Sequence, residues 1–266
     1  MSERIAFERP PVTEVVFSVA FALAHPMATP HVGAYWTRIR DRFPTIQENI
    51  PLPPLQPPQF VGGEPQLQQV QFALLDLPPL RRVWFVSHDG RDLIQLQEDR
   101  FVFNWRRNEA DGDYPGYDKV EARFEEHLAE FVRFLSEEDL GMPSYSGFEL
   151  AYVNQLDEQN GLREVGFGAM LVDHRREDRA ERFLAAPFAG NSTSLYRLPN
   201  NFGMLQVQSQ GNPTGLRLDM VARGAATAGG DEARRAWFAL AHDTIVRGFV
   251  DVTNPELHKR DWGRID

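Results

Sequence analysis

The sequence contains no cysteine. This absence excludes disulfide bonds, thiolate nucleophiles and zinc sites built on cysteine ligands. The segment 1–10 mixes acidic and basic side chains and has no apolar run of the kind found in signal peptides. No stretch approaches the roughly 18 apolar residues that a membrane-spanning helix needs. We therefore expect a cytoplasmic protein with no membrane partner.

Positive charge is also scarce. The chain has 28 Lys and Arg residues against 38 Asp and Glu residues, which gives a formal net charge of −10. Nucleic-acid binding depends on basic side chains that neutralise phosphates, so this balance argues against a direct nucleic-acid partner. An acidic excess is typical of a soluble surface. With 42% hydrophobic and 25% charged residues, the composition is that of an ordinary folded protein.

Motifs for catalysis, metal binding and nucleotide binding are missing as well. The seven histidines form no HxH or HExxH spacing, and the chain has no GxSxG, GxxxxGKS/T or GxGxxG pattern. His242 precedes Asp243 on a predicted helix, where neighbours in sequence point in different directions. Acidic pairs such as Glu125 and Glu126 suit a solvated helix face better than acid–base catalysis. We predict no catalytic residues, no metal site and no cofactor.

The apolar residues that are present repeat with two different periods. Helical spacing predicts helices over 29–43, 120–135 and 231–252, with Thr29 and Asp231 as N-caps. Alternation predicts strands over 14–21, 69–74, 83–87, 93–97, 101–106, 148–153, 166–172, 194–198, 204–208 and 216–221. Strands joined by short turns must pair antiparallel. The sequence therefore predicts an α+β fold of antiparallel sheets backed by helices.

The second half of the chain repeats the pattern of the first. The strand pair over 93–106 and the helix that follows it correspond to the strand pair over 204–221 and the last helix. This repetition predicts an internal duplication. We expect two structurally related α+β halves, 1–143 and 144–266, that share one compact unit.

Two irregular segments allow alternative interpretations. Segment 51–58 reads Pro-Leu-Pro-Pro-Leu-Gln-Pro-Pro, which predicts an extended polyproline-type loop because proline fixes φ and lacks an amide donor. Its PxxP spacings suit docking to an aromatic groove on a partner, or else the segment is a stiff connector lying over its own domain. Segment 173–182 intersperses both charges and predicts a solvated loop or helix face.

Two strands carry candidate binding residues. Asn154 continues the apolar face of the strand that contains Tyr152, and a buried amide needs a hydrogen bond, either to backbone or to a ligand or partner. Trp105 continues the apolar face of another strand, whereas Arg106 points the other way. The end of this strand therefore either places a core tryptophan beside polar residues or forms an arginine-lined recognition patch. We take Tyr152, Asn154, Trp105 and Arg106 as candidate binding residues.

Several short motifs carry a resemblance. They are PPVTEVVF at 10–17, FNWRR at 103–107, YVN at 152–154, and the stretch 242–249 followed by Trp262-Gly263. Together they resemble a sporadically distributed bacterial family of about this length that has no assigned function. The resemblance implies a bacterial cytoplasmic protein from a patchily inherited gene, and patchy inheritance is typical of mobile-element, defence or toxin–antitoxin genes.

These observations favour binding over catalysis. We expect a non-enzymatic protein that binds another protein, as an accessory or immunity-type component of a bacterial defence or toxin–antitoxin system. The alternative is a small-molecule pocket or an enzyme of unfamiliar type, using Tyr152, Asn154, Trp105 and Asp219 between sheet and helices. A lined cavity would favour the alternative, whereas a filled core with an exposed apolar patch would favour a protein partner. The identity of the partner or ligand and the oligomeric state stay open.

Overall fold

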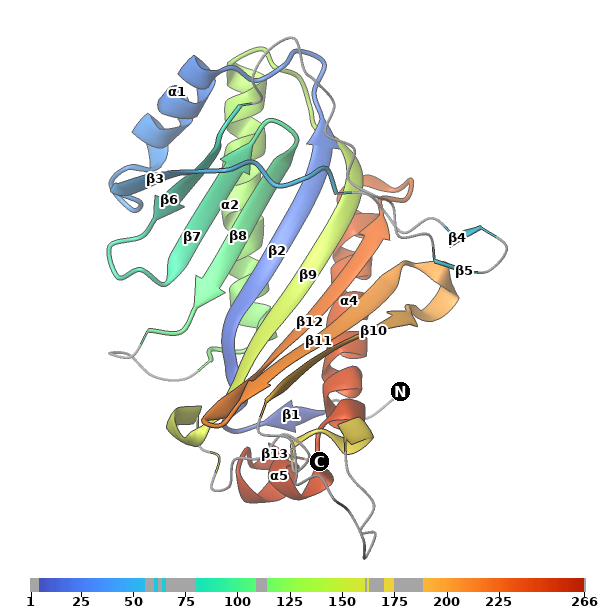
Figure 1. Cartoon of the computed structure of the whole chain (residues 1–266). Coiled ribbons are helices and arrows are strands. Elements are labelled where there is room, and N and C mark those ends of the chain that lie inside the picture. The colour runs from blue at the N-terminus through green and yellow to red at the C-terminus, as the bar shows by residue number, and fades with distance from the viewer. Residues whose placement is uncertain are drawn as a thin grey trace, which may run out of the picture.

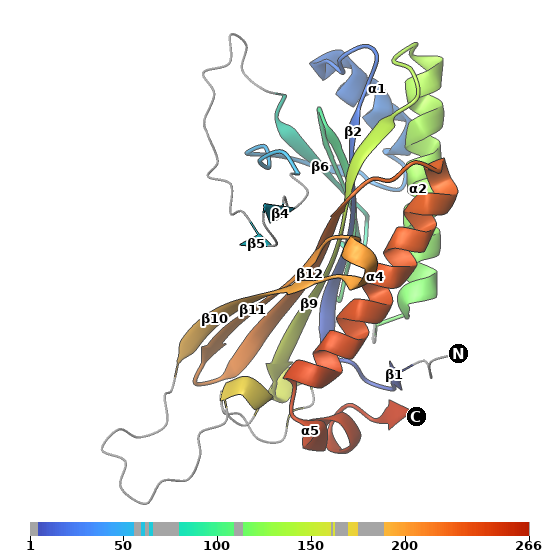
Figure 2. The same ribbon diagram turned by 90° about the vertical axis from the view of Figure 1, so that its right-hand side faces the viewer.

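A computed structural model describes residues 5–55, 60–61, 64–65, 80–108, 114–160, 162, 170–174 and 189–265. Its main feature is a nine-stranded sheet in which every neighbouring pair of strands is antiparallel. Helices α2 (Tyr117–Glu137) and α4 (Gly230–Val252) cover one face of this sheet (Figures 1 and 2). The predicted α+β class, with antiparallel sheet backed by helices, is confirmed.

The strands follow one another across the sheet in a symmetrical order. From one edge to the other they are β10 (Gly190–Arg197), β11 (Met204–Asn212), β12 (Gly215–Ala225), β9 (Ser144–Asp157), β2 (Val12–Ala22), β8 (Arg100–Arg106), β7 (Asp92–Gln97), β6 (Arg82–Val86) and β3 (Thr45–Asn49). The long strands β2 and β9 form the central pair.

Apart from β3, which extends the sheet beyond β6, the two sides of the central pair have the same topology. In the first half β2 pairs with β8, the last strand of the meander β6-β7-β8, and α2 follows. In the second half β9 pairs with β12, the last strand of the meander β10-β11-β12, and α4 follows. This order agrees with an internal duplication. Common descent of the halves and their boundary at 143/144 stay predictions.

The core lies between the helices and the sheet, and aromatic rings fill much of it. Phe17 of β2 lies with its ring centroid 4.8 Å from that of Phe124 of α2 and 5.1 Å from that of Phe238 of α4. Phe101 of β8 stacks on Phe131 of α2 at 5.1 Å. Successive side chains of a strand point to opposite faces, so the alternation in the sequence selects the face that the helices cover.

The remaining elements surround this layer. Helix α1 (Thr29–Ile39) packs against α2, where Tyr35 contacts Phe131 and Phe134. The short elements are β1 (Ala6–Phe7), β4 (Phe60–Val61), β5 (Glu64–Pro65), η1 (Glu158–Asn160), η2 (Val172–His174), η3 (Pro199–Asn201), α5 (Pro255–Arg260) and β13 (Arg264–Ile265). None of the helices in the described part of the chain combines the length and the apolar composition needed to cross a membrane.

The predicted helix ends need correction. The N-cap of α1 is Ala28, whose backbone N–H donates to His31 Nδ1 at 2.9 Å, so Thr29 is already the first helical residue. The N-cap of α4 is Gly229, at a φ of 130° that glycine adopts readily, and Asp231 lies within the first turn. At the other end, α1 stops at Ile39 rather than at 43.

Four predicted segments fall partly or wholly outside the described residues. The strand predicted over 69–74 lies outside them, as do 166–169 and 175–182. The strand prediction for 166–172 is wrong at its end, because Leu171 makes only an isolated bridge with Thr253 before η2 begins. Residues 56–58 also lie outside. Residues 51–55 lie over the chain's own sheet, where the backbone of Leu52 bonds the Gln97 side chain at 2.9 and 3.1 Å, as the connector interpretation predicts.

Candidate functional site

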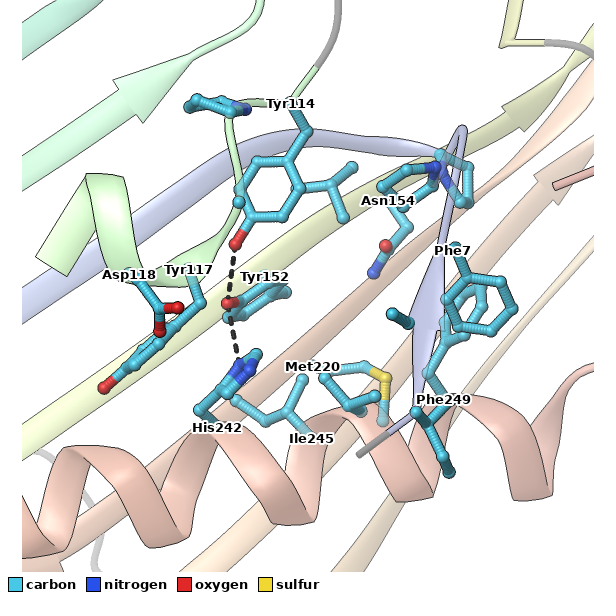
Figure 3. A pocket seen from close by; sticks show the side chains of 18 of the residues that line it. Phe7, Tyr114, Tyr117, Asp118, Tyr152, Asn154, Met220, His242, Ile245 and Phe249 are labelled. Atoms are coloured by element: carbon cyan, nitrogen blue, oxygen red, sulfur yellow. Dashed lines mark hydrogen bonds between the residues drawn. The ribbon is translucent and has the colours of Figure 1, made fainter. Parts of the chain in front are cut away.

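A pocket of about 580 Å³ lies between α4, strands β9 and β12, the N-terminal segment 5–12 that enters β2, and the segment that leads into α2. Its walls are apolar on one side and polar on the other (Figure 3). The apolar side chains include Phe7, Met220, Ile245 and Phe249, and the polar ones include Tyr114, Tyr152, Asn154 and His242. Two of the candidate binding residues, Tyr152 and Asn154, therefore line one pocket.

A chain of hydrogen bonds forms the polar wall. The Tyr152 hydroxyl oxygen lies 3.0 Å from the Tyr114 hydroxyl oxygen and 3.0 Å from Nδ1 of His242 (Figure 3). The three residues come from β9, from the segment before α2 and from α4. Burial, reinforced by Tyr114, raises the pKa of Tyr152 well above its usual value. Tyr152 is therefore an uncharged hydrogen-bonding group at neutral pH.

The first turn of α2 fixes the His242 ring. The Tyr117 ring stacks on His242 with 4.0 Å between ring centroids and 9° between planes. The Tyr117 hydroxyl donates to Oε1 of Glu121 at 2.8 Å, which holds the ring in place. Burial, followed by the Glu121 carboxylate, raises the pKa of Tyr117. The polar wall is thus held by contacts from both long helices.

Asn154 occupies an irregular point of the central strand pair. The register between β2 and β9 shifts there, since Val12 lies opposite Asn154 but Glu14 lies opposite Val153. The side chain is 2% exposed, and its Nδ2 donates to the backbone oxygen of Leu218 at 3.0 Å. This bond agrees with a structural role. The amide also points into the pocket (Figure 3), so Asn154 makes this bond and lines the pocket at the same time. A ligand-binding role of Asn154 stays a prediction.

The structure separates the other candidate residues from this pair. Trp105 is 3% exposed and packs behind Tyr114, at 5.3 Å between ring centroids, without lining the pocket. Arg106 donates to the backbone oxygen of Gly90 at 3.1 Å and does not line the pocket. Asp219 instead bonds Arg217, at 2.9 and 3.0 Å. The pocket thus contains two of the five residues that the sequence proposed.

Sequence reasoning missed Tyr114 and His242. His242 had a usable signal, because it continues the helical spacing of Phe238, Ile245 and Phe249 and therefore shares their buried face. Tyr114 lies in an irregular segment, where no periodicity indicates which way a side chain points. Its position in the site follows from tertiary structure alone.

The described residues contain no group of three His, Asp or Glu side chains placed to hold a metal ion. The comparisons with known proteins add no assignment, because no protein-family model matches the chain and no curated protein matches it. The resemblance to a bacterial family therefore stays a prediction. The pocket itself offers phenol hydroxyls, a carboxamide and an imidazole beside an apolar wall, and the charged residues Asp118 and Lys119 also line it.

Proposed function

We propose that this protein binds a small, largely apolar molecule in the pocket between α4 and the β9–β12 part of the sheet. The observation that carries the proposal is a cavity of about 580 Å³ in which Tyr152 and Asn154 converge from one strand. Small-molecule sites have this size, with mostly apolar walls and a few placed polar groups. The cavity favours the pocket alternative over a protein with a filled core.

A neutral hydrophobic dye, N-phenyl-1-naphthylamine, tests this proposal. We expect a saturable rise in its fluorescence when the protein is added. Val246 is half-buried and lines the pocket, so Val246→Trp would fill part of it and weaken dye binding about tenfold or more. Asp251→Trp is the matched control, because Asp251 is exposed on the same helix and does not line the pocket.

Two results would reject the pocket. One is the absence of saturable dye binding to the folded protein. The other is an equal loss in both tryptophan variants, which would place the dye elsewhere on the surface. Circular dichroism of each variant verifies that the fold is retained.

A second candidate function, binding of a protein partner, is favoured by the edge of the sheet. Within the described residues β10 pairs on one side alone, with β11. It also exposes two large apolar side chains, Leu195 at 36% and Tyr196 at 42%. An exposed edge strand offers backbone groups to an added strand. A partner from a bacterial defence or toxin–antitoxin system, met in the cytoplasm, is the class that the resemblance implies.

Cross-linking in the native host, followed by purification and mass spectrometry, tests this second candidate. We expect Leu195→Lys to lose the cross-linked partner, because it puts a charge on the apolar part of the β10 edge. Ile46→Lys is the control, since Ile46 is 45% exposed on β3 at the opposite edge of the sheet. Recovery of the same partner with both variants would exclude docking at β10.

A further inference from the structure

One polar atom of the pocket differs from the rest. Asn154 is 2% exposed, and its Nδ2 donates to the backbone oxygen of Leu218 at 3.0 Å. Among the described residues, no hydrogen bond reaches its Oδ1. The amide points into the pocket (Figure 3). A carbonyl oxygen that is withdrawn from bulk water therefore faces the ligand space without a protein donor.

The bond to Leu218 fixes which end of the amide the ligand meets. Reversing the amide would direct its oxygen at another carbonyl oxygen, and two acceptors repel each other. The ligand therefore meets the Oδ1 acceptor at Asn154, beside the one N–H of Nδ2 that the bond to Leu218 leaves over. A ligand that supplies a donor satisfies this acceptor, whereas an apolar group placed against it forfeits the hydrogen bond. A carboxylate or phosphate oxygen placed against Oδ1 would be repelled, because both atoms are acceptors.

The neighbouring phenol of Tyr152 does not repeat this demand. The Tyr152 hydroxyl already takes part in two hydrogen bonds, to Tyr114 and to His242. A phenol has one proton to donate, so both of these contacts are satisfied within the protein. Opposite lies the apolar wall, which includes Met220 and Phe249. Beside this apolar surface, Oδ1 of Asn154 is thus an acceptor that no donor of the described residues reaches.

From this arrangement we propose that Asn154 selects, by its Oδ1, uncharged ligands that carry a hydroxyl or N–H donor on a compact apolar body. Phenols, alicyclic alcohols and secondary amides belong to this class, whereas carboxylates and phosphates do not. The inference rests on the proposed function, because it names the ligand class of the same pocket. Asn154 acts here as a specificity-determining residue.

A matched pair of probes tests the inference without any mutation. 2-Naphthol and 2-methoxynaphthalene share one ring system and are both uncharged at pH 7, but only the first has a hydroxyl donor. We expect 2-naphthol to bind the unmodified protein at least about tenfold more tightly in calorimetric titration. Equal affinities would overturn the inference and leave the pocket proposal intact. Absence of binding by both probes would reject both.

A variant then assigns the preference to Asn154. Asn154→Leu keeps the number and branching of the side-chain heavy atoms and lacks the acceptor, so we expect it to bind both probes with the affinity that the unmodified protein shows for 2-methoxynaphthalene. A preference for 2-naphthol that survives in this variant would overturn the role of Asn154. If Asn154→Leu does not fold, competition decides in the unmodified protein: 2-naphthoate should fail to displace 2-naphthol, and displacement at similar concentrations would overturn the selectivity.

Discussion

Mild acid should destabilise this protein through a histidine that lies far from the pocket. His127 of α2 is 6% exposed and packs between Phe43 and Phe103, with ring centroids 5.2 and 5.3 Å away. Burial, followed by the charge of Arg42, lowers its pKa to about 4. Its charged neighbours are Arg42, Arg123, Glu126 and Glu130. The folded protein therefore holds His127 neutral at a pH where an unfolded chain protonates it.

The sign and size of the effect follow from linkage. Between about pH 6.5 and pH 4 the unfolded state binds a proton that the folded state does not, so the free energy of unfolding falls as the pH falls. At pH 5 this difference is worth about 2 kcal/mol for His127. His258, whose pKa burial also lowers to about 4, adds a similar contribution. Because His258 is present in both proteins, its contribution cancels when the His127 variant is compared with the unmodified protein.

Urea denaturation at pH 7 and pH 5 measures the effect. The loss in free energy of unfolding between the two values should be smaller by about 2 kcal/mol in His127→Leu than in the unmodified protein. His25→Leu, at an exposed position, should show the full loss. Equal losses in all three proteins would refute the argument that His127 is buried and neutral.

Two further pairs of substitutions test the core by urea denaturation. Arg234→Ala removes a side chain that is 3% exposed and paired with Glu125, so it should lower the free energy of unfolding by about 3–5 kcal/mol. Arg235 pairs with the same carboxylate but is 63% exposed, so Arg235→Ala should lower it by less than about 1 kcal/mol. Gly224→Ala would place a Cβ 2.1 Å from a backbone oxygen and 2.4 Å from Nε1 of Trp237, so it should destabilise by several kcal/mol or prevent folding. Gly33 is exposed on α1, and a Cβ added there would have no other part of the structure within 4 Å. Gly33→Ala should therefore raise the free energy of unfolding by about 0.5–1 kcal/mol, because alanine favours a helix more than glycine does.

Alternation predicted the inner strands better than the edge. In β2, Val15, Phe17 and Val19 all face the helices and are 0% exposed, so the period of two is strong. Strand β10 begins at Gly190, four residues before its predicted start at 194, because its polar residues are held by backbone pairing with β11 rather than by a buried face. Strong period-two signals arise only where one face is buried.

The site was predicted in part for a similar reason. Asn154 could be recognised because it interrupts an apolar alternation, and Tyr152 because it lies on the same face of β9. The partners of Tyr152 come from elements 38 and 90 residues away in sequence, and no local pattern specifies such contacts. Trp105 and Arg106 were placed on opposite faces correctly, but their strand lies beyond the pocket wall.

The repeated strand order around β2 and β9 has a further consequence for the seam between the two long helices. Contacts of Tyr117 with His242 and of Arg234 with Glu125 show that α2 and α4 run in opposite directions. A second hollow, of about 690 Å³, therefore opens at the other end of the seam, against the segment that enters β9 instead of the one that enters β2. The first hollow has the Tyr152–His242 hydrogen bond beside its apolar wall, whereas the second combines apolar side chains with the ion pair of Arg234 and Glu125. One architectural plan thus supplies two hollows of different polar chemistry at opposite ends of one helix seam.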